Sequence, residues 1–128
     1  MTKNEQIETS TAEYYIDADI FFIRAKQDAD FTLEAVIEGV DVRKKMQQGK
    51  IFPVLMDTRL MFQSAKEANE YGASKDVSEL SSAMAILVGT SMSARIIGNF
   101  FIKFNKPFVP TKLFNSEEKA IEWLNSFK

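Results

Sequence analysis

Two short apolar runs, at residues 51–56 and 83–88, constrain the fold of this chain more than any other feature. Both runs are apolar in the two alternating side-chain phases of a β-strand, which is typical of a strand that is covered on both faces. A segment with helical spacing or a helix start follows each run. This alternation predicts a mixed, largely parallel sheet with helices packed on it.

The segment before the first run adds a hairpin and a helix. Residues 6–25 predict two strands with a polar break at residues 17–19, because β-branched and aromatic residues flank that break. Residues 32–49 predict a helix that Thr32 caps and Gly49 ends. Its basic residues near the end fit the negative end of the helix dipole, and they are Arg43, Lys44 and Lys45.

The first apolar run carries a proline and leads into a second helix. Pro53 cannot donate to a strand ladder, so it predicts either an edge strand or a bulge. Ser64 and Glu67 have the spacing of a capping box, in which each side chain accepts from the other residue's backbone N–H. We therefore expect Ser64 to begin a helix that Gly72 ends.

The last third of the chain completes the pattern. Residues 76–81 predict a helical turn, residues 111–114 predict a short strand, and Ser116 predicts the cap of a final helix. The expected fold is one α/β domain over residues 1–128, in which residues 1–5 are flexible. It has about five strands and about four helices, in the order β-β-α-β-α-β-α-β-α.

Cysteine and histidine are both absent, which removes disulfides, thiolate nucleophiles, the usual zinc and iron ligands and the commonest general base. We therefore expect no metal, no cofactor and no catalytic residue. Ser116 and Lys119 have Ser-x-x-Lys spacing but lack the companion motifs of that catalytic set, so we interpret them as a cap and a solvated lysine. The chain is not expected to be an enzyme.

Charge and hydropathy bound the partners. There are 16 basic and 18 acidic residues, a balance that predicts neither nucleic acid nor an anionic membrane as a partner. Residues 1–10 lack an apolar signal core, and the apolar segment 94–104 is interrupted by charged and polar residues. We expect a cytoplasmic protein without an integral membrane segment.

Several motifs together resemble the STAS-like, or SpoIIAA-like, superfamily of bacterial anti-sigma-factor antagonists. They look closer still to a group of small uncharacterised bacterial proteins assigned to that superfamily. The motifs are Phe-Pro-Val-Leu-Met-Asp-Thr-Arg at 52–59, Ala-Met-Ala-Ile-Leu-Val at 83–88, Gly-Asn-Phe-Phe-Ile-Lys-Phe-Asn-Lys-Pro at 98–107, Pro-Thr-Lys-Leu-Phe at 110–114, and Ala120, Trp123 and Leu124.

This resemblance implies a single STAS-like domain that acts through a protein partner, such as a kinase that is also an anti-sigma factor. In the antagonists that kinase phosphorylates a serine at a helix start, and by position Asp57 and Ser64 are the counterparts. The antagonists typically carry Asp-Ser-Ser-Gly there, whereas this chain has Gln63, Ser64, Ala65 and Lys66. Ser64 thus has two interpretations, a helix cap and a regulatory phosphosite.

Two groups of polar residues follow the apolar runs. Asp57 and Arg59 either order their loop or form an anion or ligand site with Ser64 and Lys66. After the second run, three residues form either an anion-binding nest or an ordinary cap, and they are Ser91, Ser93 and Arg95. The structural interpretations are therefore an ordered loop for the first group and a helix cap for the second.

An aromatic stripe at helical spacing, formed by Phe100, Phe101 and Phe104, predicts core packing, with an apolar ligand or a homodimer as alternatives.

Taken together, the sequence favours a non-enzymatic regulatory domain that contacts a protein through residues 57–71. The alternative is a domain that binds a small molecule, at the carboxyl ends of the two central strands or in a phenylalanine-lined cavity.

Overall fold

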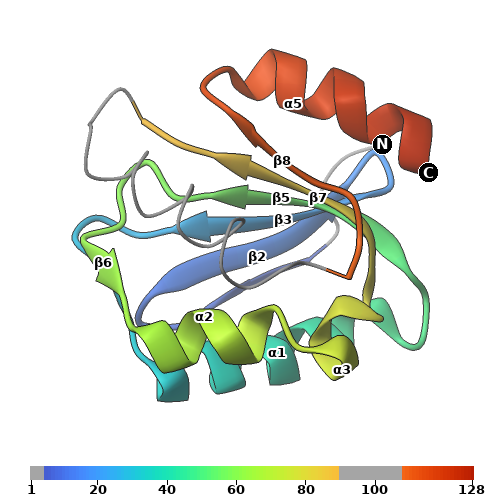
Figure 1. The fold of residues 1–128 in the computed structure, drawn as a ribbon. Coiled ribbons are helices and arrows are strands. Elements are labelled where there is room, and N and C mark those ends of the chain that lie inside the picture. The colour runs from blue at the N-terminus through green and yellow to red at the C-terminus, as the bar shows by residue number, and fades with distance from the viewer. Residues whose placement is uncertain (1–4, 90–107) are drawn as a thin grey trace.

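The computed structural model describes residues 5–89 and 108–128, and its main feature is a six-stranded mixed sheet in the order β1-β2-β3-β5-β7-β8 (Figure 1). The first three strands pair antiparallel, and β3, β5, β7 and β8 pair parallel. The mixed, largely parallel sheet is therefore confirmed. The strands are β1 (Gln6–Glu8), β2 (Ala12–Asp17), β3 (Ile20–Ala25), β5 (Phe52–Asp57), β7 (Ser81–Leu87) and β8 (Thr111–Phe114).

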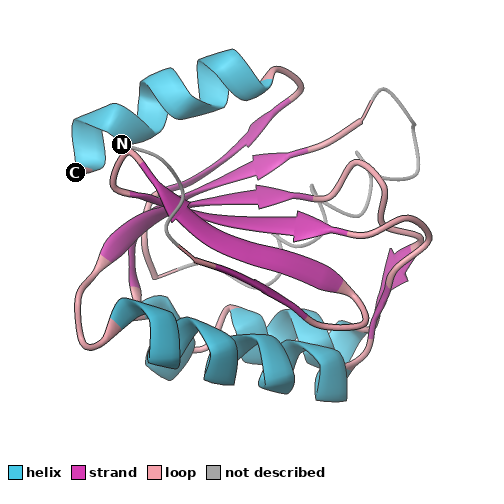
Figure 2. Cartoon of the chain, turned by 180° about the vertical axis from the view of Figure 1, so that it is seen from behind, coloured by secondary structure: helices cyan, strands magenta, loops and turns pink. Residues whose placement is uncertain are grey.

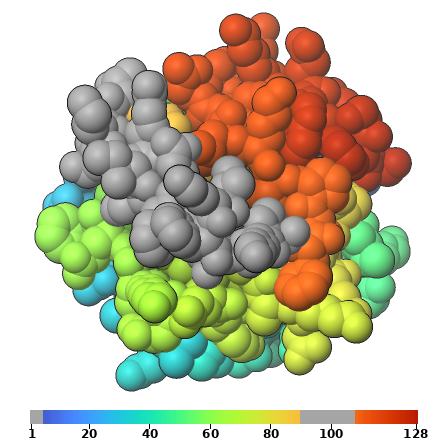
Figure 3. All heavy atoms as spheres, viewed as in Figure 1, coloured from blue at the N-terminus to red at the C-terminus, as the bar shows by residue number. Residues whose placement is uncertain are grey.

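Helices cover both faces of this sheet (Figures 1 and 2). On one face lie α1 (Leu33–Gln47), α2 (Lys66–Gly72) and α3 (Lys75–Ser78), and on the other lies α5 (Glu117–Leu124), which continues into the 3₁₀ turn η1 (Asn125–Phe127). In the space-filling view, α2 and α3 form the lower part of the visible face, with β8 and α5 above (Figure 3). Three of the four expected helices are therefore described, as α1, α2 and α5, and the helix expected between the strands at 83–88 and 111–114 lies outside the described residues.

Strand alternation separates the core into two layers. On β2 and β3, Tyr15 and Phe22 pack with the cluster under α5, whereas their neighbours Tyr14 and Phe21 pack with the cluster under α1. Consecutive strand residues point to opposite faces, so two adjacent aromatics supply two different cores.

The predicted hairpin is β2–β3, and its turn residues Ala18 and Asp19 both have positive φ, at 50° and 63°. A two-residue turn of this kind matches the twist of the flanking strands. The sequence prediction omitted β1 as a separate strand, because its three residues pair only with β2 at the sheet edge.

Two local predictions about α1 and β5 are confirmed. The Thr32 hydroxyl accepts from the backbone N–H of Ala35 at 3.1 Å, and Gln48 and Gly49 end α1 with positive φ. At Pro53 the register with β7 shifts, which is the predicted bulge. The edge alternative for Pro53 is wrong, since β5 lies between β3 and β7.

The predicted cap at Ser64 is wrong. Ser64 belongs to β6 (Gln63–Ser64), which pairs parallel with β4 (Asp30–Phe31) in a small second sheet. The backbone N–H of Ala65 donates to the carbonyl of Phe31 at 3.0 Å, so the chain is still extended at residue 64. The N-cap of α2 is Ala65, without a side-chain hydrogen bond.

The carboxyl-terminal predictions are confirmed. Strand β8 has the predicted bounds, and the Ser116 hydroxyl accepts from the backbone N–H of Lys119 at 3.3 Å, so Ser116 is the cap of α5. The predicted turn at 76–81 is α3, which is shorter and begins one residue earlier, because Ser81 already belongs to β7. None of the helices described is long and apolar enough to cross a membrane.

Candidate functional site

A cluster of four charged side chains lies at the carboxyl ends of β3 and β5. Asp57 ends β5 and stands in register with Arg24 of β3. Its Oδ2 accepts from Arg24 Nη1 and from Arg59 Nη2, both at 2.9 Å. Its Oδ1 accepts from the backbone N–H and Nε of Arg59, at 3.1 and 3.0 Å. Asp57 therefore fixes both the loop after β5 and an arginine of the neighbouring strand.

Glu117, in the first turn of α5, completes this four-charge cluster. Its two carboxylate oxygens accept from Nη1 and Nη2 of Arg24, each at 2.9 Å, and Arg59 Nη2 lies 3.3 Å from Oε1. The Nε of Arg24 donates to the Tyr15 hydroxyl at 2.7 Å. The bidentate pair joins residues 93 positions apart and holds the start of α5 on the sheet.

The pairing shifts the pKa values of both acids downward. Burial alone would raise the pKa of Asp57, but hydrogen bonds from Arg59 and Arg24 outweigh it and keep that pKa below its usual value. The hydrogen bond from Arg24 is the main reason that the pKa of Glu117 is lowered. Both acids are thus held in their charged forms.

The four-charge cluster is internally neutral, since two guanidinium groups face two carboxylates. The loop-ordering interpretation of Asp57 and Arg59 accounts for these contacts. Neither Ser64 nor Lys66 takes part in any hydrogen bond or ion pair of the cluster, so the structure does not bring the four predicted residues into one site. Lys66 is exposed at the first position of α2.

The remaining predicted groups lie outside the described residues. They are Ser91, Ser93 and Arg95, and the stripe of Phe100, Phe101 and Phe104. In the described part of the chain, no group of three or more acidic, histidine or cysteine side chains is placed to hold a metal ion.

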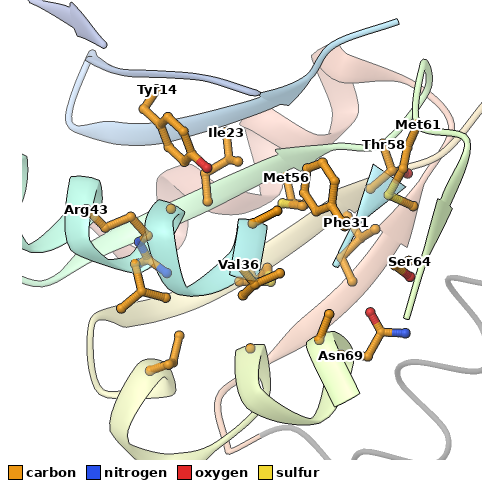
Figure 4. Close-up of a pocket in the computed structure, with 18 residues that line it drawn as sticks. Tyr14, Ile23, Phe31, Val36, Arg43, Met56, Thr58, Met61, Ser64 and Asn69 are labelled. Atoms are coloured by element: carbon orange, nitrogen blue, oxygen red, sulfur yellow. The ribbon is translucent and has the colours of Figure 1, made fainter. Parts of the chain in front are cut away.

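On the opposite face of the sheet, a cavity of about 120 Å³ lies between the sheet and the helices α1, α2 and α3 (Figure 4). Small residues of the two longer helices face it, namely Ala35 and Gly39 of α1 and Ala68 and Gly72 of α2. Because these side chains end at Cβ or lack one, the helices cannot fill the space above the strands. Three methionines on its wall, Met56, Met61 and Met84, leave it adaptable in shape.

Gly39 leaves room for the side chain of Tyr14, which lies directly against this position of α1. A Cβ atom built on Gly39 would lie 2.3 Å from the Tyr14 hydroxyl oxygen, which is far inside contact distance. The absence of a side chain in mid-helix therefore lets the Tyr14 ring reach over α1. At Gly72 the nearest atom to such a Cβ is Val36 Cγ1 at 3.8 Å, so that position has room.

Polar groups mark the two ends of the cavity. Arg43 lies at one end, and Ser64 and Asn69 lie at the other (Figure 4). The Ser64 hydroxyl oxygen is buried and has no hydrogen-bond partner among residues 5–89 and 108–128. A buried hydroxyl without a partner is costly, so Ser64 has a hydrogen-bonding group that the described residues leave unused.

Arg43 is 3% exposed. Its Nε donates to Gln47 Oε1 at 2.9 Å and its Nη2 donates to Ser81 Oγ at 3.0 Å, while its guanidinium lies 5.4 Å from the centre of the Phe21 ring. Burial lowers its pKa to about 10. Within residues 5–89 and 108–128, no carboxylate forms an ion pair with it.

Sequence reasoning placed Arg43 among the basic residues at the end of α1 and missed its burial. The missed signal is helical spacing, because Arg43 and Gln47 continue the face that Val36 and Val40 begin. Arg24 and Glu117 were also missed as members of a site, since their pairing depends on contacts between distant segments.

The sheet order and the helices on both faces define a SpoIIAA-like α/β domain. A solved structure with this fold, an uncharacterized protein from the DUF3478 family of Shewanella loihica PV-4, matches with a TM-score of 0.56 over 94% of this chain and 90% of that one. The two sequences are 14% identical, so this similarity concerns the fold alone. The SpoIIAA-like fold expected from the sequence is thereby confirmed.

The chain belongs to the DUF7793 family, whose profile, described as a domain of unknown function, matches residues 14–128. No functionally curated protein matches the chain.

Proposed function

We propose that this protein is a non-enzymatic binding domain that takes up a small, largely apolar molecule in the cavity beneath α1 and α2. One observation carries the proposal, namely a cavity of about 120 Å³ between a sheet and helices that are otherwise in contact. Protein interiors are close-packed and contain few voids larger than a water molecule. A cavity of about this size in another protein is large enough for benzene.

The composition of the cavity wall supports the same function. Ligand sites are mostly apolar and contain a few polar groups that orient the ligand. Apart from Thr58, the described wall between the two ends is aliphatic, aromatic or methionine, and at one end stands the Ser64 hydroxyl, which has no partner among the described residues. The proposed ligand site thus corresponds to the alternative in the sequence analysis, and among the described lining residues Phe31 is the one phenylalanine.

Methionine methyl groups offer a direct test. With 13C-methyl methionine labelling, benzyl alcohol is expected to shift the NMR signals of Met56, Met61 and Met84, which line the cavity. Met46 is the internal control, because it packs in the same core layer but not on the cavity wall. Unchanged signals of the three cavity methionines at millimolar probe would contradict the proposal.

A variant pair at Gly72 makes the test specific. Gly72→Leu is expected to fill the cavity and abolish the shifts, because a side chain at this position has room and extends toward Val36. Gly72→Ala adds only one methyl group and should retain binding. Equal binding by both variants would place the probe somewhere other than this cavity.

Regulation of Ser64 by phosphorylation, and a kinase or anti-sigma-type partner, stay predictions. The buried Ser64 hydroxyl argues against direct access, since a kinase would reach it only after β6 or α2 moved away. Intact mass of the protein from its source cells is the measurement, and an added phosphate that Ser64→Ala abolishes would restore the switch.

Protein contact is a second candidate function, and exposed apolar residues within 57–71 favour it. Leu60 is 49% exposed and Phe62 is 64% exposed, on the connection between β5 and β6. We infer self-association through this connection, whereas the sequence linked a homodimer to the stripe of Phe100, Phe101 and Phe104. Sedimentation is expected to show a dimer that Phe62→Ser weakens, and a wild-type monomer at about 100 μM, well above micromolar affinities, would remove this candidate.

A further inference from the structure

We propose that the ligand of the cavity is an acid, a small apolar monocarboxylate whose carboxylate pairs with Arg43. This inference rests on the proposed binding function and adds the chemical class of the ligand. It comes from a buried charged group that pairs with no carboxylate of the described residues.

Arg43 lacks a counter-charge among the described residues. Removing a cation from water is costly unless an anion or a full set of hydrogen bonds compensates for it. In the described part of the chain, Arg24 has two carboxylates as partners, whereas Arg43, which is far more buried, has none. A bound carboxylate would supply the charge that is missing at Arg43.

Arg43 makes hydrogen bonds to two described side chains. A guanidinium has five N–H donors in a fixed fork. Two hydrogen bonds hold this one, from Nε to Gln47 and from Nη2 to Ser81, and neither uses Nη1. No acceptor among the described side chains takes Nη1, and the Arg43 side chain lines the cavity. A carboxylate is the acceptor whose two oxygens match such a fork.

Arg43 is held in place before any ligand arrives. Gln47, which accepts from Arg43, donates from Nε2 to the carbonyls of Lys50 and Leu80, both at 2.9 Å. The Phe21 ring supports the guanidinium from the sheet side. A donor group fixed in advance loses little side-chain entropy on binding, which favours affinity.

The size of the cavity limits the acid. Ala35 and Arg43 both line the cavity, and eight residues of α-helix correspond to about 12 Å. The volume of about 120 Å³ holds a ring or a short chain beside the guanidinium. Benzoate and hexanoate, each with an acid group on about six carbons, are therefore suitable probes.

The test compares each acid with its neutral analogue. Benzoate and benzyl alcohol, and hexanoate and 1-hexanol, are titrated by calorimetry and followed by the methyl signals of Met56, Met61 and Met84. In the wild type, each acid is expected to bind at least about tenfold more tightly than its alcohol, which is the usual size of a charge-assisted hydrogen bond.

Variants of α1 identify the responsible charge. Arg43→Met is expected to lose at least about tenfold in affinity for the acids, again from the charged hydrogen bond, and to lose less in affinity for the alcohols. Lys44→Met removes one positive charge from the exposed neighbour and should match the wild type. Arg43→Gln serves in place of Arg43→Met if the methionine signals show that the latter is not folded.

The two proposals fail in different ways. If the alcohols bind and the acids bind no more tightly, or if Arg43→Met keeps its affinity for the acids, the acid inference is wrong and the cavity function stands. If neither acids nor alcohols shift the methionine signals of the wild type, both proposals are wrong.

Discussion

Two arginines on opposite faces of the sheet occupy similar places and have different surroundings. Arg24 lies 5.2 Å from the centre of the Phe22 ring, and Arg43 lies 5.4 Å from the centre of the Phe21 ring, so each covers one of two adjacent phenylalanines of β3. Arg24 pairs with Asp57 and Glu117. Arg43 pairs with no carboxylate of the described residues and borders a cavity.

The different surroundings of the two arginines suit different roles, a structural one for Arg24 and a ligand-binding one for Arg43. The charges around Arg24 neutralise one another, and their geometry ties α5 to the carboxyl ends of β3 and β5. Among the described residues, the charge of Arg43 is compensated only by two neutral side chains and an aromatic ring. A site whose partners are complete has little to offer a ligand, whereas an incomplete one can gain from it.

The largest effect is expected on the paired side. Arg24→Met should lower the free energy of unfolding by about 2–3 kcal/mol, because it leaves Asp57 and Glu117 with fewer partners in a part-buried site. Urea denaturation followed by tryptophan fluorescence measures it, since Trp123 lies on α5. Lys26→Met, which breaks the more exposed ion pair with Glu8, is the control and should cost under about 1 kcal/mol. Equal losses in the two variants would contradict a special role of the cluster.

On the cavity side, two glycines provide the next comparison. Gly39→Ala should destabilise the protein by about 1–3 kcal/mol, because the new methyl group overlaps the Tyr14 hydroxyl. Gly72→Ala has room and should stabilise it by up to about 1 kcal/mol through better helix propensity. Thermal unfolding of both variants checks the sign of each effect. A stabilised Gly39→Ala variant would mean that Tyr14 leaves its position easily.

Arg43→Met tests the unpaired side directly. We expect the stability of the ligand-free protein to be unchanged or to increase by up to about 2 kcal/mol, because an apolar side chain replaces a buried charge that has no counter-ion among the described residues. Urea denaturation without added ligand is the measurement. A loss above about 2 kcal/mol would mean that Gln47, Ser81 and Phe21 already compensate the charge of Arg43.

The smallest expected effect is on the stability of the protein at low pH. The pKa values of Asp57 and Glu117 are lowered in the folded state, so their contribution to stability is present above the unfolded values of about 4 to 4.5. It is lost as pH falls through the lower, folded values. Glu117→Gln should lose under about 1 kcal/mol at neutral pH, since Glu117 is 34% exposed, and should show a shallower loss of stability below pH 4.5.

The control for this pH dependence is a variant that removes a carboxylate which forms no ion pair. Glu118→Gln provides it, because Glu118 is exposed and forms no ion pair with the described residues. Its stability should follow the wild-type pH profile. A shallower profile in Glu118→Gln as well would assign the effect to net charge rather than to the four-charge cluster.

Local chemistry explains what the sequence predicted well. The caps at Thr32 and Ser116 and the strand at Thr111–Phe114 depend on hydrogen bonds or side-chain periods within a few residues. The bulge at Pro53 follows from the missing N–H of proline. Such features are visible in the chain because the interacting groups are neighbours in it.

Ser64 shows where local reasoning fails. Its spacing to Glu67 satisfies the capping-box pattern, yet pairing with Phe31 keeps residue 64 extended and moves the start of α2 to the next residue. The competing partner comes from a segment more than thirty residues earlier. A two-residue strand has too short a pattern to be predicted, so tertiary contacts decided the outcome.

The sequence by itself determined the alternation of strands and helices, most of their ends and the absence of cysteine and histidine chemistry. Only the tertiary structure decided which charges are paired, because Arg24, Asp57 and Glu117 come from three distant segments. It also decided that Arg43 lies beside a cavity, since the cavity exists only where small residues of α1 and α2 face the sheet together. Periodicity reports which face of an element is buried, whereas the partner and the space left between elements depend on how those elements pack.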